Sequence, residues 1–190
     1  MTPDRTTRGR RSLRLRDNDY AQNGAYYVTL CIQRRAHLLG EIADGAIRLS
    51  DAGRMVHLAW ETLPSHLPGV EMDSFIVMPD HLHGIIVLTG SGECRPCIEP
   101  GPDNMIAGQE QICRHPLSLG DVVARFKTWT MRQYATGVRE YDWPLYMGRL
   151  WQRNYYDHIV RDEADLARIR EYIATNVACW AENNQDWGDL

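Results

Sequence analysis

A four-residue turn between two apolar segments constrains the fold more than any other feature of this chain. Residues 70–78 and 84–88 are rich in β-branched and apolar side chains and are typical of strands. Pro79 presets the backbone for the first central position of a turn, and Asp80 suits the second. The sequence therefore predicts an antiparallel hairpin whose second strand opens with the triplet 81–83, His-Leu-His.

The two histidines of this triplet are expected to lie side by side. Side chains two positions apart in a strand point to the same face, so His81 and His83 project together while Leu82 faces the other way. Two neighbouring imidazoles are suitable ligands for a divalent metal ion. A half-buried structural strand explains the same pattern, because His-x-His is a short motif with many chance matches. The spacing alone leaves both interpretations open.

The remaining elements alternate between strands and helices along the chain. We expect a strand at 25–33, a small hairpin at 38–49, helices at 50–63, 118–134 and 163–180, and a strand within 151–159. Pro64 and Pro68 are expected to end the first helix. This order predicts an α+β, ferredoxin-like sandwich, in which an antiparallel sheet carries helices mainly on one face and a C-terminal helix follows.

The predicted organisation is one domain with less regular ends. Residues 1–19 are interpreted as a flexible basic arm, 20–180 as a single domain, and 181–190 as a polar tail. Residues 90–116 show no periodicity and are interpreted as a loop insertion. Within it, a zinc site and a loop of free thiols both remain open for Cys94, Cys97, Cys113 and His115.

Charge and cysteine content narrow the class of protein. The net charge is −4, but the arm is basic because it contains Arg5, Arg8, Arg10, Arg11, Arg14 and Arg16. This concentration of positive charge is a weak indication of phosphate binding. Five cysteines, an odd number, favour a reducing compartment over a disulfide framework. No segment approaches the roughly 18 apolar residues of a membrane span. We therefore expect a cytoplasmic protein without a membrane partner.

The last helix places a phenol and an amide together. Its apolar stripe is formed by Leu166, Ile169, Ile173, Val177 and Trp180. Tyr172 and Asn176 lie on one shoulder of that stripe at i and i+4, where side chains are neighbours. A tyrosine nucleophile beside an amide metal ligand is one interpretation of this pair, and ordinary packing is the other.

Several ordered segments resemble one known family, the REP-associated tyrosine transposases of the single-tyrosine HUH group. The similar segments cover nearly the whole chain and are 11–16 (RSLRLR), 24–30 (GAYYVTL), 75–87 (FIVMPDHLHGIIV), 122–128 (VVARFKT), 151–162 (WQRNYYDHIVRD) and 168–176 (RIREYIATN). Asp80 is a departure, because the family has Asn there more often. The insertion at 90–116 has no counterpart that we can assign.

The resemblance implies metal-dependent cleavage and joining of single-stranded DNA at short palindromic, REP-like hairpins. It implies that His81, His83 and Asn176 hold Mg²⁺ or Mn²⁺ and that Tyr172 is the nucleophile. Tyr155 and Tyr156 are rival tyrosines, interpreted as structural or as a surface for stacking bases. Whether such a protein acts as a monomer or a homodimer stays open.

Basic and aromatic residues outside the predicted metal site are candidates for DNA contacts. Given the resemblance, these are expected to be Arg8, Arg10, Arg11, Arg14 and Arg16 of the arm, Arg125, Lys127 and Arg132 of the middle helix, and Trp151 and Arg153. Two alternatives remain: a DNA-hairpin-binding protein that has lost catalysis, and an RNA-binding module on the same kind of sheet.

Overall fold

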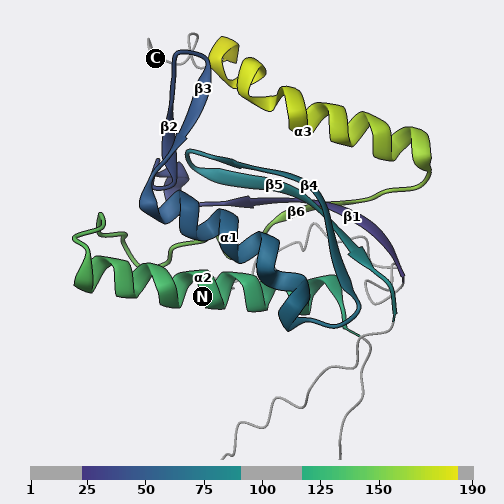
Figure 1. Cartoon of the computed structure of the whole chain (residues 1–190), viewed down its shortest axis with the longest axis horizontal. Coiled ribbons are helices and arrows are strands. Elements are labelled where there is room, and N and C mark those ends of the chain that lie inside the picture. Colours follow the sequence, from purple (N-terminus) through teal and green to yellow (C-terminus); the bar gives the residue numbers. More distant parts are fainter. Residues whose placement is uncertain (1–22, 91–116, 184–190) are drawn as a thin grey trace, which may run out of the picture.

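The computed structural model describes residues 23–90 and 117–183, which form a single layered unit (Figure 1). The elements in chain order are β1 (Gly24–Cys31), a short 3-10 helix (Gln33–Arg35), β2 (Gly40–Ala43), β3 (Ala46–Leu49), α1 (Asp51–His66), β4 (Val70–Met78), β5 (His81–Leu88), α2 (Leu119–Glu140), β6 (Tyr156–Ile159) and α3 (Glu163–Asn183). None of the helices in this described part of the chain is long and apolar enough to cross a membrane.

Four strands form one antiparallel sheet in the order β4-β5-β1-β6, and β2 pairs with β3 in a separate hairpin. Helices α1 and α2 cover one face of the large sheet, and α3 crosses the other face (Figure 1). The predicted α+β, ferredoxin-like sandwich with most helices on one face and a C-terminal helix is therefore confirmed.

Strand β5 separates two different environments. Its even-numbered residues Leu82 and Ile86 are fully buried in the main core beneath α1 and α2. Its odd-numbered residues turn toward α3, where Ile85 belongs to a smaller apolar cluster. This alternation places His81 and His83 on the α3 face, as the period of a strand requires.

Caps and turns set the ends of the main elements. Ser50 caps α1 by accepting a hydrogen bond from the N–H of Gly53 at 3.0 Å, and Ser118 forms a capping box with Asp121 at the start of α2. The expectation that Pro64 ends the first helix is wrong, because α1 continues to His66. A proline can be accommodated there, since its ring disturbs only the turn that precedes it.

Three further boundaries differ from the sequence-based expectations. Helix α2 extends to Glu140 rather than 134, the last strand is limited to Tyr156–Ile159, and α3 extends to Asn183 into the expected polar tail. The arm arginines Arg8, Arg10, Arg11, Arg14 and Arg16, and the group Cys94, Cys97, Cys113 and His115, lie outside the described residues.

Candidate functional site

Two buried histidines follow the tight turn between β4 and β5 and lie on the sheet face below α3. His81 and His83 are only 3% and 6% exposed. Their rings meet edge to face with centroids 4.5 Å apart, and their Nε2 atoms approach each other at 2.8 Å. The structure thus brings together the two side chains that the alternating pattern predicted to share a face.

The other ring nitrogen of His81 is held by a buried carboxylate. Nδ1 of His81 lies 2.5 Å from Oδ1 of Asp80, which is itself buried, and Oδ2 of Asp80 accepts from Nε of Arg35 at 3.0 Å. A carboxylate accepts only, so Nδ1 of His81 donates and carries the ring proton. Its Nε2 is the nitrogen that faces His83.

His83 is held in turn by two hydroxyls of β1. Its Nδ1 lies 2.7 Å from the hydroxyl of Tyr27 and 2.9 Å from Oγ1 of Thr29. Burial, with smaller effects of His81 and Arg35, lowers the pKa of His83 to about 3. The ring is therefore neutral at pH 7, which is the state in which an imidazole binds a metal ion.

Helix α3 places three side chains over this pair. The ring of Tyr172 lies 5.5 Å from the ring of His83, and the ring of Trp180 lies 5.3 Å from the ring of His81. Asn176 is four residues from each of them, on the same face of the helix, so it lies between the two contacts. Asn176 is 6% exposed, whereas Tyr172 is 46% exposed. The amide is thus enclosed, and the phenol is open to an incoming ligand.

A small apolar cluster and an ion pair hold α3 in this position. Ile169 and Ile173 pack against Tyr27 and Ile85 on the sheet. Farther out, Arg170 donates to the carboxylate of Asp73 on β4 at 3.0 and 2.6 Å. The Arg170 guanidinium lowers the pKa of Asp73 to about 2.

The buried side of α3 is rotated from the predicted stripe. Ile169 and Ile173 are buried as expected, but the third buried position is Asn176, whereas Leu166 and Val177 are only half-buried. The rotation follows from the polar pocket that the histidine pair forms, because this pocket receives an amide better than an aliphatic side chain.

The donor set fits a divalent ion. Two imidazoles present Nε2 toward one another, each is fixed through Nδ1 by a further polar group, and an amide lies above them. Within residues 23–90 and 117–183 no group of three or more His, Cys, Asp or Glu side chains is arranged to hold a metal. A metal ion here would therefore rely on His81, His83 and Asn176, with the rest of its coordination left to other oxygens.

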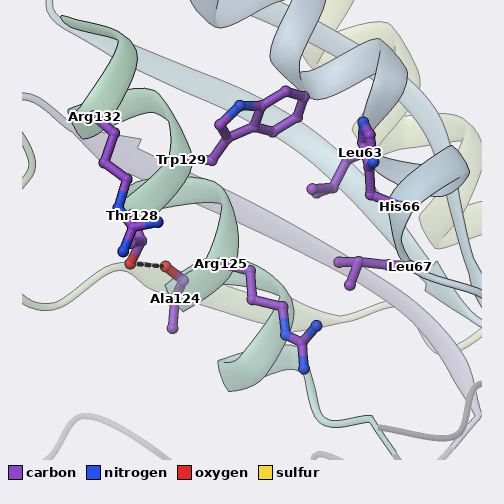
Figure 2. A pocket seen from close by; sticks show the side chains of 8 residues that line it. All are labelled: Leu63, His66, Leu67, Ala124, Arg125, Thr128, Trp129 and Arg132. Carbon is purple, nitrogen blue, oxygen red and sulfur yellow. Dashed lines mark hydrogen bonds between the residues drawn. The ribbon is translucent and has the colours of Figure 1, made fainter. Parts of the chain in front are cut away.

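Two of the predicted DNA-contacting arginines line a groove on the opposite side of the sheet. The groove has a volume of about 530 Å³ and lies between the end of α1 and the first half of α2. Figure 2 shows Arg132 and Arg125 along α2, and His66 on the other side of Trp129 from Arg132, beside Leu63. The rings of Trp129 and His66 meet edge to face with centroids 5.0 Å apart.

Lys127 and Trp151 are held by contacts within the protein, Trp151 in the core and Lys127 at a half-buried position. Trp151 is 4% exposed, and its Nε1 donates to Oγ1 of Thr130 at 2.9 Å. Nζ of Lys127 donates to the carbonyl oxygen of Gln152 at 2.8 Å. Trp151 thus offers little surface for a stacked base, whereas Arg153 is exposed. The DNA contacts of Lys127, Trp151 and Arg153 stay predictions.

The rival tyrosines lie at different distances from the histidine pair. Tyr156 is exposed, and its ring lies 6.1 Å from that of Tyr27, about as far as the 6.2 Å between Tyr172 and Tyr27. Tyr155 is half-buried beneath Nζ of Lys127. Among these three tyrosines, a ring contact to His83 is seen only for Tyr172, at 5.5 Å.

Sequence reasoning missed the residues that surround the pair. Tyr27, Thr29 and Arg35 were not among the candidates, although all three contact the histidines or Asp80. The alternation of β1 indicates that Tyr27 and Thr29 share a face. Only the register of β1 on β5, which pairs Thr29 with His83, shows which face that is.

Two known proteins are similar to this chain in sequence over most of its length. No family model matches the chain. A Haemophilus influenzae protein of uncharacterised function is 34% identical over 176 residues, which are 92% of this chain and 91% of that protein. A second H. influenzae protein, named "Putative REP-associated tyrosine transposase", is 24% identical over 174 residues, which are 89% of this chain and 80% of that protein.

The fold also has a solved counterpart. The structure of a REP-associated tyrosine transposase bound to a REP hairpin matches 87% of this chain and 73% of that one, with a TM-score of 0.54 and 16% sequence identity. The resemblance expected from the sequence is thereby confirmed. The chain belongs to one family with the uncharacterised H. influenzae protein and has the fold of the REP-associated tyrosine transposases.

Proposed function

We propose that this protein is a transposase-like enzyme that nicks and rejoins single-stranded DNA through Tyr172 with the aid of a divalent metal. The observation that carries the proposal is the position of an exposed phenol over a buried, mutually facing pair of imidazoles. An ordinary packing tyrosine has no need of two imidazole nitrogens that face one another beneath it. The transposase-like fold and relatives support the same conclusion.

The proposed reaction is a transesterification. The Oη atom of Tyr172 forms a bond to the phosphorus of a phosphodiester as the bond from phosphorus to the 3′ oxygen breaks. The tyrosine gives up its proton to solvent, and the leaving 3′ oxygen takes one up, so the products are a 5′-phosphotyrosine ester and a 3′ hydroxyl. The ester conserves the bond, and a DNA hydroxyl can therefore reverse the step without ATP.

Mg²⁺ or Mn²⁺ is the proposed cofactor, held by His81, His83 and Asn176. When bound, such an ion offsets the negative charge that develops on the phosphate oxygens. The protein's own contribution is to keep both imidazoles oriented, through Asp80 for His81 and through the β1 hydroxyls for His83.

The proposed substrate is a single strand that forms a short hairpin. The solved structure of similar fold is bound to a REP hairpin, which makes a palindromic DNA element the first substrate to test. Arg153, Arg125 and Arg132 are the described basic residues proposed to contact phosphates, together with the arginines of the N-terminal arm. Such contacts make binding weaken steeply with salt.

The test is the formation of a covalent protein–DNA adduct. Wild-type protein is incubated with labelled single-stranded hairpin DNA in the presence of Mg²⁺ or Mn²⁺ and is then denatured. The proposal predicts an adduct that resists denaturation, requires the metal, and disappears in Tyr172→Phe. Since Tyr172 is 46% exposed, loss of its hydroxyl is expected to leave the fold intact.

The matched control is Tyr156→Phe, which removes the hydroxyl of the other exposed tyrosine near Tyr27. This variant should form the adduct normally. If Tyr156→Phe abolishes the adduct and Tyr172→Phe retains it, the nucleophile is Tyr156. If the wild type binds hairpins but forms no adduct on any of them, the protein is a hairpin-binding relative without catalysis.

A further inference from the structure

The hydroxyl of Tyr27 occupies a position between the histidine pair and the proposed nucleophile. It lies 2.7 Å from Nδ1 of His83, and Oγ1 of Thr29 donates to it at 3.3 Å. On its other side the ring of Tyr172 stands nearly perpendicular, with centroids 6.2 Å apart, so the two phenols are neighbours. Tyr27 therefore contacts both His83 and Tyr172.

Counting donors and acceptors fixes the direction of these bonds. A phenol has one O–H donor and can accept from other groups. When Nε2 of His83 is a ligand, its Nδ1 carries the ring proton and must donate, and Thr29 donates as well. The oxygen of Tyr27 then accepts from both, and its single O–H is left for the oxygen of Tyr172.

We propose that Tyr27 is a positioning residue for the nucleophile: its hydroxyl, held by His83 and Thr29, donates to the oxygen of Tyr172 and aims that oxygen at the phosphate. The inference rests on the proposed function of Tyr172. It adds that the hydroxyl of Tyr27 has two tasks: it holds Nδ1 of His83, and it orients the nucleophile.

The surroundings of Tyr27 suit this role. Its side chain is buried and packs against Ile85, Ile169 and Ile173, so the ring has little freedom to move. The ordinary pKa of a phenol is about 10, so a tyrosine hydroxyl carries its proton at neutral pH and can donate. The proton that Tyr172 releases during the attack is therefore not passed to Tyr27, which already carries one.

The first test compares rates with Tyr27→Phe, which keeps the ring and removes only the hydroxyl. With saturating hairpin DNA and saturating Mg²⁺, the single-turnover rate of adduct formation should fall about 10- to 100-fold, the range expected for a misaligned reacting group. DNA affinity, measured by fluorescence anisotropy, should stay unchanged. Tyr156→Phe, whose ring also contacts Tyr27, is the control and should react at the wild-type rate.

The dependence of the rate on Mg²⁺ concentration distinguishes positioning of the nucleophile from mere orientation of a metal ligand. Oγ1 of Thr29 also lies near Nδ1 of His83 and can keep that ring oriented without Tyr27. The rate of Tyr27→Phe should therefore stay low when Mg²⁺ is raised well beyond its half-saturating concentration. Full recovery of the rate at high Mg²⁺ would mean that Tyr27 serves only to orient a metal ligand, and this would overturn the proposal.

The second test needs neither metal nor DNA turnover. In protein labelled with ¹³C at the Cζ atoms of tyrosine, the signal of Tyr172 should shift in Tyr27→Phe and stay in place in Tyr156→Phe. An unchanged Tyr172 signal in Tyr27→Phe would also overturn the proposal. A wild type that forms no adduct refutes the proposed function and this role with it. A wild-type adduct with an unimpaired Tyr27→Phe refutes only the role of Tyr27.

Discussion

Gly84 follows His83 on β5, and its backbone packs closely against the core side chains Trp60 and Phe75. A Cβ at this position would lie 2.9 Å from Cε2 of Trp60, closer still to Cζ2 of the same indole, and 3.1 Å from Cβ of Phe75. Carbon atoms pack at about 3.5 to 4.0 Å, so Gly84→Ala requires either the indole or β5 to move by about 1 Å.

The indole has little room to move. Trp60 is fully buried and meets the ring of Phe126 edge to face at 5.1 Å. Overpacking a core generally costs about 1 to 3 kcal/mol, and we expect about 2 to 3 kcal/mol here because Trp60 is held on several sides. Any displacement taken up by β5 also moves His83, so the rate of adduct formation should fall together with stability.

A double-mutant cycle measured by urea denaturation tests the stated cause. Trp60→Leu removes the atoms that a Cβ at 84 would meet, so Gly84→Ala should cost less than about 1 kcal/mol in that background and leave a coupling energy above about 1 kcal/mol. The reasoning fails if Gly84→Ala alone costs less than about 0.5 kcal/mol, or if the two changes are additive.

Three further outcomes are expected. Trp151→Phe removes the donor to Thr130, so it should lower the free energy of unfolding by about 1 kcal/mol or more while DNA affinity in an anisotropy assay stays unchanged; a selective loss of DNA affinity would restore a DNA-binding role. Asp80→Ala should weaken Mn²⁺ binding about 10- to 100-fold in a metal titration, because Nδ1 of its histidine partner loses an acceptor; unchanged affinity would contradict this. The carboxyl of Asp73 has a folded pKa of about 2, below its ordinary 3.8, so its contribution is present above about pH 4 and lost as the pH falls toward 2. In acid-unfolding experiments the stability gap between wild type and Asp73→Asn should close over that range, and a constant gap would argue against the ion pair with Arg170.

The hairpin that carries the histidines could be predicted because its determinants are local. A proline and an aspartate define the turn, and the period of two in a strand decides which side chains share a face. The structure places the start of β5 at His81, directly after that turn. Such features need no knowledge of what packs on either side.

The burial of two other side chains depends on long-range packing and could not be predicted from local patterns. The apolar spacing of α3 suggested that Asn176 lies on the shoulder of the buried stripe, but the polar pocket over the histidines buries it. Trp151 follows Arg149 and precedes Arg153, a pattern typical of a DNA surface. An isolated bridge between Trp151 and Ile32, 119 positions earlier in the chain, brings it instead into the core.

The residues that orient the histidines could not be found from the sequence for the same reason. Tyr27 and Thr29 belong to a segment that indicates only a strand, because β-branched and aromatic residues are frequent in any strand. Their role appears only when the register of β1 against β5 is known.

The most direct test of the central claim is to identify the residue that carries DNA in the trapped adduct. After reaction with single-stranded hairpin DNA and Mg²⁺, the adduct is digested with protease and nuclease and examined by mass spectrometry. The account predicts a nucleotide 5′-phosphate on the peptide that contains Tyr172, and unmodified peptides for Tyr156 and Tyr27. A nucleotide attached at any other residue would contradict it.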